Sequence, residues 1–406
     1  MIPNIHIEDY SYPLTDEKIA KYPLAERDAS KLLIYKNQTI SEQHFYNLPD
    51  LIPNNALMVF NDTKVVPARL HFRRESGAHI EIFCLQPDTP ADYAQAFASS
   101  RICRWQCVIG NSKRWKDDQL KYYIPEDSNS LEARKLDLRA KLINRDGQTG
   151  IVEFEWKGDI PFSNVLEICG NVPIPPYLNR DTESIDLERY QTVYAHIRGS
   201  VAAPTAGLHF SDRVLEQLRS KNVNLQTVCL HVGAGTFLPV KNSEVSKHTM
   251  HREPFVVKKS LLELLVRNRS KLVAVGTTSV RTLESLYYVG VSIIESGKPE
   301  DVCQWAPYTR DYSYSTNDAL QAIIDYLDAN SLDEIKVGTK IIIVPTFKFR
   351  LVDMLITNFH QSESTLILLV AAFVGEDWRK IYDYALSHNF RFLSYGDSSL
   401  LFRKEL

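Results

Sequence analysis

The chain has 406 residues, of which 44% are hydrophobic and 24% are charged. This composition is typical of a globular protein and excludes a disordered or fibrous chain. Because one ordinary domain has about 100–200 residues, we expect two domains. The formal net charge of −3 gives no overall attraction to a polyanion, so any contact with nucleic acid must come from local patches.

The sequence shows no sign of export or of a membrane span. No apolar run approaches the roughly 20 residues of a membrane helix, and the start, MIPNIHIEDYSYPL, lacks a basic stretch followed by an apolar one. The 6 cysteines are too scattered for a disulfide scaffold in a chain of this length. We therefore expect a cytoplasmic protein with reduced thiols and no membrane contact.

The chain begins with mixed helical and strand-forming segments, among them IAKYPL and ALMVF. Residues 66–165 then form short strands separated by turns, and Val152, Phe154 and Trp156 alternate with polar residues as in a half-buried strand. Such a series predicts a small β-barrel. We expect this barrel to be inserted into a larger mixed-sheet α/β domain made of residues 1–65 and 166–406.

From about residue 188 helices alternate with apolar strands, which predicts a parallel or mixed sheet with binding sites at the strand ends. The expected helices lie at 212–221, 260–269, 277–286, 364–374 and 378–388, and the expected strands at 225–232, 272–275, 340–344 and 354–358. An extra amphipathic helix is expected near 318–329, capped by Asp318 and docked on the larger domain.

Polar residues replace apolar ones directly after several of these strands, which usually indicates a ligand. Gly233, Gly235 and Thr236 follow one strand, although a tight turn explains them equally well. Thr277 and Thr278 begin a helix whose free N–H groups suit an anion, although plain N-capping explains them too. A third strand ends in Asn358 and His360, where the imidazole is either catalytic or hydrogen-bonded structure.

The sequence contains no credible motif for a metal site, a serine hydrolase or a nucleotide-phosphate loop. Cys103-x-x-x-Cys107 and His248-x-x-His251 can be paired on paper, but there is no second cysteine pair and no HExxH. The sequence also lacks a GxSxG elbow and a GxxxxGK[ST] loop. We expect no metal site.

The clearest basic patch is Lys113-Arg114-Trp115-Lys116. Its cations could meet phosphates while the indole stacks on a base. A solvated hairpin with a half-buried Trp is the alternative.

Taken together, long ordered segments resemble the S-adenosylmethionine:tRNA ribosyltransferase-isomerases of queuosine biosynthesis. They include IAKYPLAERDASKLL (19–33), VFNDTKVVPARL (59–70), VPIPPYLNR (172–180), GSVAAPTAGLHF (199–210), LHVGAGTFLPV (230–240), HTMHRE (248–253), VAVGTTSVRTLES (273–285), LITNFH (355–360), ESTLILLVAAFVG (363–375) and FRFLSYGDSSLL (390–401). The resemblance implies an α/β domain with an inserted barrel. It also implies that the ribosyl part of S-adenosylmethionine is transferred to 7-aminomethyl-7-deazaguanine at the tRNA wobble position and isomerised, giving epoxyqueuosine, adenine and methionine.

With that reaction, S-adenosylmethionine is a co-substrate, no prosthetic group is needed, tRNA is the partner, and we expect a monomer. The sulfonium acidifies the C5′ protons, so a general base is required. The candidate catalytic residues are His209, His231, His251, Glu253, His360 and Asp397. The candidate S-adenosylmethionine ligands are Gly233, Gly235, Thr236, Thr277, Thr278, Arg281 and Asn358, and the candidate substrate or tRNA ligands are Asn61, Asp62, Arg69, Lys113, Arg114, Trp115 and Lys116.

The sequence departs from the family pattern at several places. Gln361-Ser362 replace the usual Leu-Pro, Thr346 replaces a Gly after Pro345, and Ser76-Gly77-Ala78 stands where a Gly-Gly is usual. Residues 307–339 look like an addition. Two alternatives therefore stay open: a divergent paralogue that binds RNA without this activity, and an S-adenosylmethionine-dependent methyltransferase.

Overall fold

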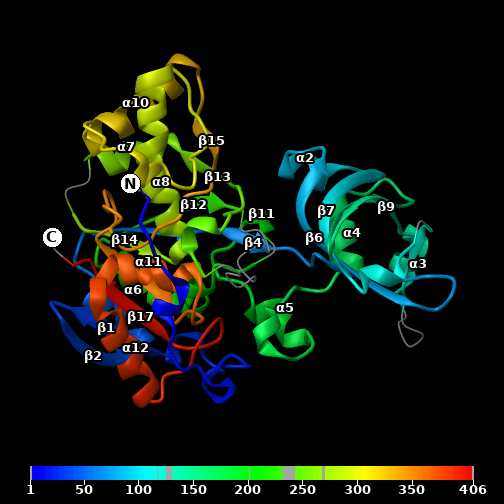
Figure 1. Cartoon of the computed structure of the whole chain (residues 1–406), viewed down its shortest axis with the longest axis horizontal. Coiled ribbons are helices and arrows are strands. Elements are labelled where there is room, and N and C mark those ends of the chain that lie inside the picture. Colours follow the sequence, from blue (N-terminus) through cyan, green and yellow to red (C-terminus); the bar gives the residue numbers. More distant parts are fainter. Residues whose placement is uncertain are drawn as a thin grey trace.

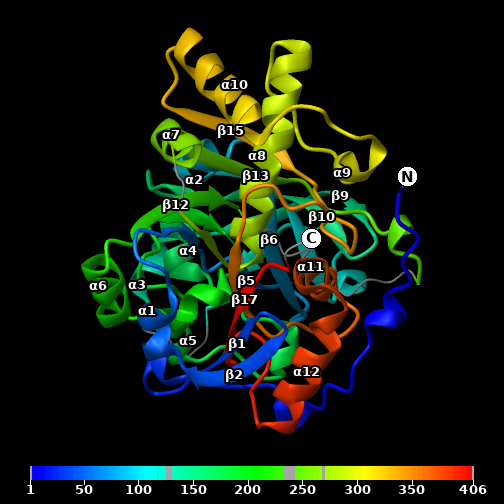
Figure 2. The same ribbon diagram turned by 90° about the vertical axis from the view of Figure 1, so that its left-hand side faces the viewer.

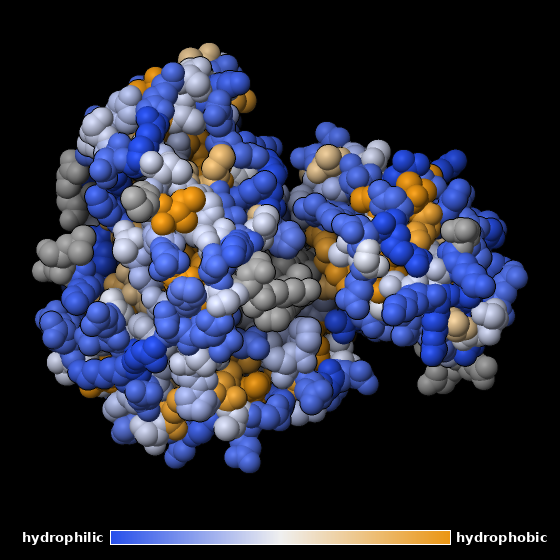
Figure 3. Space-filling model, in the orientation of Figure 1, coloured by the Kyte–Doolittle hydropathy of each residue, from blue (hydrophilic) through white to orange (hydrophobic). Residues whose placement is uncertain are grey.

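The computed structural model describes residues 2–116, 118–124, 130–200, 202–231, 243–267 and 270–404, except for the side chains of residues 198 and 199. Figure 1 shows a larger α/β body and a smaller barrel beside it, with β4 (Thr63–Val65), β11 (Ile197–Ser200) and α5 (Ser184–Arg189) between them. Figure 3 shows the barrel as a separate lobe, set off from the body by an indentation.

The body is built on a mixed sheet that has nine strands among the described residues. Their order across the sheet is β15 (Glu334–Thr339), β13 (Glu253–Lys258), β12 (Asn224–Leu230), β3 (Leu57–Asn61), β14 (Leu272–Val275), β16 (Met354–Asn358), β17 (Ser398–Phe402), β1 (Lys31–Lys36) and β2 (Thr39–His44). Strands β12, β3, β14 and β16 are adjacent and parallel. The first 61 residues thus supply three strands of the body, as expected.

Helices cover both faces of this sheet. Because strand side chains alternate between faces, Leu57 and Val59 pack into one core and Met58 and Phe60 into the other. The first core also contains residues of α7 (Lys259–Arg267), α8 (Thr277–Ser296), α10 (Thr316–Ala329), α11 (Thr365–Val374) and α12 (Trp378–Ser387). The second contains residues of α1 (Leu48–Leu51) and α6 (Asp212–Ser220). Figure 2 shows α10 and β15 at one end of the body and β2 and α12 at the other.

The smaller lobe is a closed antiparallel barrel, for which the described residues supply six strands. Around the barrel these are β10 (Thr149–Glu155), β7 (Ile102–Gly110), β6 (His79–Thr89), β5 (Arg69–Arg73), β8 (Leu120–Tyr122) and β9 (Arg139–Asp146). Three short helices accompany them: α2 (Tyr93–Ala98), α3 (Leu131–Leu136) and α4 (Phe162–Cys169). The expected fold class, an α/β body with an inserted barrel, is confirmed, while the domain boundaries at residues 66 and 165 stay a prediction.

One expected strand was wrong. Residues 341–344 are buried and Lys340 is exposed, but residues 340–344 form no strand; the neighbouring strand, β15, ends at Thr339. The backbone N–H groups of this segment form other hydrogen bonds instead. Val344 N donates to Tyr308 Oη at 2.9 Å, and Ile342 N donates to Gln304 O. The apolar side chains of this segment are therefore buried by packing, although its backbone pairs with no neighbouring strand.

The extra helix expected near 318–329 is α10, which begins two residues earlier. Its cap is Ser315 rather than Asp318, which instead reaches back to the Ser315 N–H in a capping box. The helix packs against α8 where Gly290 allows close approach, since a Cβ there would lie 2.0 Å from Ala319 O. Among the described residues no helix is both long and apolar enough to span a bilayer.

Candidate functional site

The polar strand ends meet at one edge of the sheet. Because β12, β3, β14 and β16 are parallel, their carboxyl ends lie together, which places His231, Gly276-Thr277-Thr278 and Asn358 to His360 along that edge. Gly276 has φ +85°, a conformation that favours glycine, and the chain turns there from β14 into α8. The backbone topology therefore brings these strand ends to one edge of the sheet, and their convergence on a single S-adenosylmethionine pocket stays a prediction.

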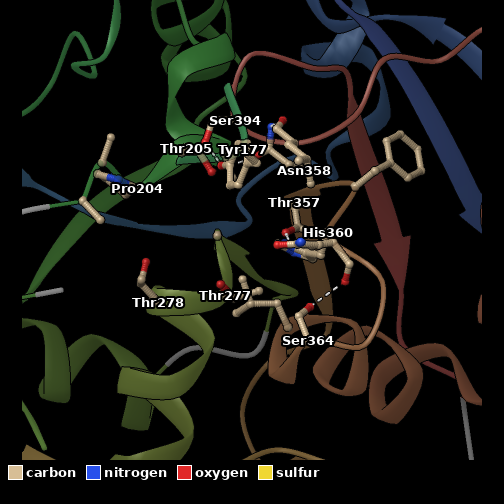
Figure 4. Close-up of a pocket in the computed structure, with 18 of the residues that line it drawn as sticks. Tyr177, Pro204, Thr205, Thr277, Thr278, Thr357, Asn358, His360, Ser364 and Ser394 are labelled. Atoms are coloured by element: carbon tan, nitrogen blue, oxygen red, sulfur yellow. Dashed lines mark hydrogen bonds between the residues drawn. The ribbon is translucent and has the colours of Figure 1, made fainter. Parts of the chain in front are cut away.

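A cavity opens at this edge, which we call the strand-end cavity (Figure 4). The amino end of α8 faces it, and no side chain caps that helix end. In the described structure the Thr278 hydroxyl is buried without a hydrogen-bond partner. Polar lining residues are Tyr177, Tyr190, Thr205, Thr277, Thr278, Thr357, Asn358, His360, Gln361, Ser362, Glu363, Ser364 and Ser394. Among the described lining residues, Glu363 carries the only carboxylate, so this cavity offers hydroxyls, one imidazole, one negative charge and free helix N–H groups.

His360 lines the strand-end cavity and is held from several sides. Its ring Nε2 lies 2.8 Å from Thr357 Oγ1. Its backbone N–H donates to Tyr382 Oη, and its backbone carbonyl accepts from the Tyr12 hydroxyl. Burial lowers its pKa to about 4, because a charged imidazole would lose its hydration. At neutral pH the ring is uncharged and able to accept a proton.

His209 does not line the strand-end cavity but supports it from behind. Asn358 Nδ2 donates to His209 Nε2 at 3.0 Å, so Nδ1 carries the ring proton and donates to Ser30 Oγ at 2.8 Å. Thr205 Oγ1 donates to Asn358 Oδ1 at 2.9 Å, which fixes the orientation of that amide. Both ring nitrogens are therefore occupied, and the geometry favours positioning Asn358 over proton transfer.

A second, larger cavity of ≈ 520 Å³ lies between the barrel and the body, and we call it the interdomain cavity. His231 stacks on Tyr93 of barrel helix α2 with ring centroids 4.5 Å apart and planes at 4°, which joins the two lobes. His251 lines the same cavity beside His248. The two cavities share Ser364 and Leu366, so they are neighbours along the start of α11.

Glu253 and Arg281 form a buried ion pair in the wall of the interdomain cavity. Arg281 Nε also donates to Ile341 O at 3.2 Å, whereas its Nη2 is buried and has no hydrogen-bond partner among the described residues. An unpaired guanidinium N–H beside a cavity is costly unless a ligand accepts from it. The pair thus presents a donor and a carboxylate to whatever occupies this space.

Other candidates lie away from both cavities. Asn61 uses its amide to bridge the Leu230 backbone at 3.0 Å, which is a structural bond between β3 and β12. Asp397 accepts from the N–H groups of Lys31 and Arg391 and from the Arg391 side chain. Asp62 is buried with one carboxylate oxygen unpartnered, and burial raises its pKa. These contacts do not favour the catalytic role predicted for Asp397.

The prediction made for the basic patch on the barrel is wrong in one respect. Trp115 is only 1% exposed, and its Nε1 donates to Asp118 O at 2.9 Å, so the indole belongs to the barrel core and cannot stack on a base. Lys113, Arg114 and Lys116 are exposed, and their contact with tRNA stays a prediction. Arg69, also predicted to contact substrate, lines the interdomain cavity beside Glu81.

The predicted ligands Gly233, Gly235 and Thr236 lie outside the described residues. In the part of the chain that is described, no group of three metal-ligating side chains comes together. The residues predicted from the sequence did not include Tyr177, Glu363 and Ser394, which line the strand-end cavity. Each of them lies in or beside a segment that resembles the family. Of the departures from the family pattern, Gln361 and Ser362 line the strand-end cavity, whereas Thr346 and the 76–78 turn line neither cavity.

Comparison with known proteins gives a consistent result. The sequence model of the family described as "Queuosine biosynthesis protein" matches residues 7–401. The S-adenosylmethionine:tRNA ribosyltransferase-isomerase of Azoarcus sp. (strain BH72) is 35% identical, over 99% of this chain and 99% of that protein. The protein of the same name from Trichlorobacter lovleyi is 36% identical, over 97% of this chain and 99% of that protein. The chain therefore belongs to the queuosine biosynthesis family of S-adenosylmethionine:tRNA ribosyltransferase-isomerases.

Proposed function

We propose that this protein transfers the ribosyl moiety of S-adenosylmethionine to 7-aminomethyl-7-deazaguanine at the tRNA wobble position and isomerises it. The products are epoxyqueuosine in tRNA, adenine and methionine. The observation that carries this proposal is the adjacency of two cavities with different chemistry, which share Ser364 and Leu366. Two substrates bound in them would meet at that shared wall.

S-Adenosylmethionine suits the strand-end cavity. Its carboxylate matches the uncapped amino end of α8, where N–H groups and the positive end of the helix dipole favour an anion. Thr277 and Thr278 would add hydroxyl donors, and the Glu363 carboxylate would offset the positive sulfonium. His360, uncharged at neutral pH, is the side chain we assign to removal of the C5′ proton.

The modified base suits the interdomain cavity. A guanine-type edge presents one acceptor, O6, beside two donors, N1–H and the exocyclic amine. Arg281 Nη2 would donate to O6 while the Glu253 carboxylate accepts from the two donors. His231 and His251 would then flank the aminomethyl group, which must lose a proton as it attacks. We further propose a cytoplasmic monomer that needs no prosthetic group.

Identification of the small-molecule products tests this proposal. The purified protein is incubated with S-adenosylmethionine and tRNA carrying the aminomethyl base, and the supernatant is analysed by chromatography and mass spectrometry. We expect adenine and methionine in equal amounts, with a matching mass increase in the tRNA. S-Adenosylhomocysteine as the product would identify a methyltransferase. Tight tRNA binding with intact S-adenosylmethionine would identify an RNA-binding paralogue instead.

A further inference from the structure

A third cavity lies on the other side of Ser394 from the strand-end cavity, and we call it the arginine cavity. Its described lining contains the side chains of Arg27, Arg189 and Arg391 and no carboxylate. The three come from distant parts of the chain: the 3-10 turn Arg27–Ala29 before β1, the end of α5 and the segment before β17. None of the functions assigned above uses them.

Within the described part of the chain, two of the three guanidinium groups form no ion pair. Arg27 donates to the carbonyls of Glu188, Arg189 and Leu208. Arg189 donates to the carbonyls of Leu24 and Ala25, and its Nε is buried with no partner in the part of the chain that is described. Carbonyls satisfy N–H groups but leave the positive charge in place. Arg391 is different, since it pairs with Asp397 at 3.2 Å.

This concentration of charge acts on its neighbours. Burial and the Arg189 charge lower the pKa of Arg27, against an opposing effect of the Glu188 charge. Burial, with smaller effects of the Arg391 and Arg27 charges, lowers the pKa of His209. Repulsion of this kind is relieved by an anion. Ser30 and Tyr395 also line the cavity. A guanidinium fork beside neutral polar groups suits a phosphate, whose oxygens accept from two N–H groups at once.

The arginine cavity is open to solvent and has a volume of only ≈ 20 Å³, so a larger anion would sit at its mouth. Resting on the proposed function, we propose that the mouth of the arginine cavity binds a phosphodiester of the tRNA anticodon loop, next to the wobble nucleotide. The position supports this source of phosphate. His209 lines the arginine cavity and holds Asn358, which lines the strand-end cavity, so a phosphate here lies one side-chain layer from the site of S-adenosylmethionine. With a net charge of −3, the protein needs local cations of this kind to hold RNA.

The test uses the full-length protein and an anticodon stem-loop, with binding measured at several salt concentrations. Arg189→Gln should weaken RNA binding about tenfold and reduce the slope of log K against log salt by about 0.7, the value for one single-strand phosphate. Arg189→Lys, which keeps the charge, should retain part of the affinity. Arg219→Gln, which removes an exposed charge of α6 outside the three cavities, should change neither value much. S-Adenosylmethionine affinity without RNA should be unchanged throughout.

A second measurement needs no variant and therefore survives if Arg189→Gln fails to fold. Stem-loops carrying a single neutral methylphosphonate at each loop position are bound to the wild-type protein. One position should weaken binding about tenfold, and its effect should disappear in any folded Arg189→Gln protein. Equal affinity at every position, or an Arg189→Gln protein that loses S-adenosylmethionine affinity instead, would overturn the inference. If adenine is released normally while both results fail, the proposed function stands without this phosphate site.

Discussion

His209 makes the stability of the protein depend on pH in a way that the structure quantifies. Burial, with help from the Arg391 and Arg27 charges, lowers its pKa from 6.5 to about 3. The folded protein therefore binds fewer protons than the unfolded chain between those values. Its stabilising contribution is complete above pH 6.5 and is lost progressively as the pH falls towards 3.

The magnitude follows from the two pKa values. At pH 5 the unfolded imidazole is almost fully protonated and the folded one is not, so His209 alone lowers the free energy of unfolding by about 2 kcal/mol relative to pH 7. Protonation would also remove the nitrogen lone pair that accepts from Asn358, so the two states cannot share one hydrogen-bond network.

The perturbation is His209→Gln, which cannot be protonated. Urea unfolding of both proteins at pH 7 and pH 5, followed by circular dichroism, gives four free energies. The change in the free energy of unfolding between pH 7 and pH 5 is calculated for each protein, and the two changes are subtracted. Other groups, including His360, titrate equally in both proteins and cancel in this subtraction. We expect the variant to be less stable at pH 7 but to lose about 2 kcal/mol less than the wild type on acidification. Equal losses in the two proteins would show that His209 titrates normally in the fold and would refute the reasoning.

Further predictions concern the site and the fold. His360→Ala should lower single-turnover adenine release by about 100-fold or more, while calorimetry shows similar S-adenosylmethionine affinity. Wild-type turnover in a folded His360→Ala protein would assign the residue a structural role. Thr278→Ala should mainly weaken S-adenosylmethionine affinity, by about 0.5–2 kcal/mol. Neutralising the Lys113, Arg114 and Lys116 cations should weaken tRNA binding and flatten its salt dependence, and an unchanged salt slope would assign them to ordinary solvation. Dialysis against a strong chelator should leave activity intact, and a loss restored by zinc alone would contradict this. Thr346 has φ +85°, so Thr346→Gly should raise the free energy of unfolding by about 1 kcal/mol in urea titrations; a less stable variant would show that this backbone is unstrained.

Several features of the protein could be read from the sequence because they depend on neighbours along the chain. The alternation of Val152 and Phe154 predicted a barrel strand, and the apolar run before Gly276 predicted β14 at its observed bounds. Polar residues after apolar strands predicted ligand sites at one edge, since parallel strands end on the same side of a sheet. Periodicity and strand direction are local properties, and local sequence encodes them.

The rest was decided by contacts between residues far apart in the sequence. Trp115 is a core residue because the barrel closes over it, and residues 340–344 form no strand because Tyr308 and Gln304 take their backbone groups. His209 makes hydrogen bonds with Ser30 and Asn358, which lie 179 and 149 residues away, and these bonds favour a positioning role over the predicted catalytic one. Arg27 and Arg189, 162 residues apart, meet only in the folded chain. Burial and hydrogen-bond partners are properties of three-dimensional proximity, so the tertiary structure alone determined which polar side chains face a cavity and which hold the fold together.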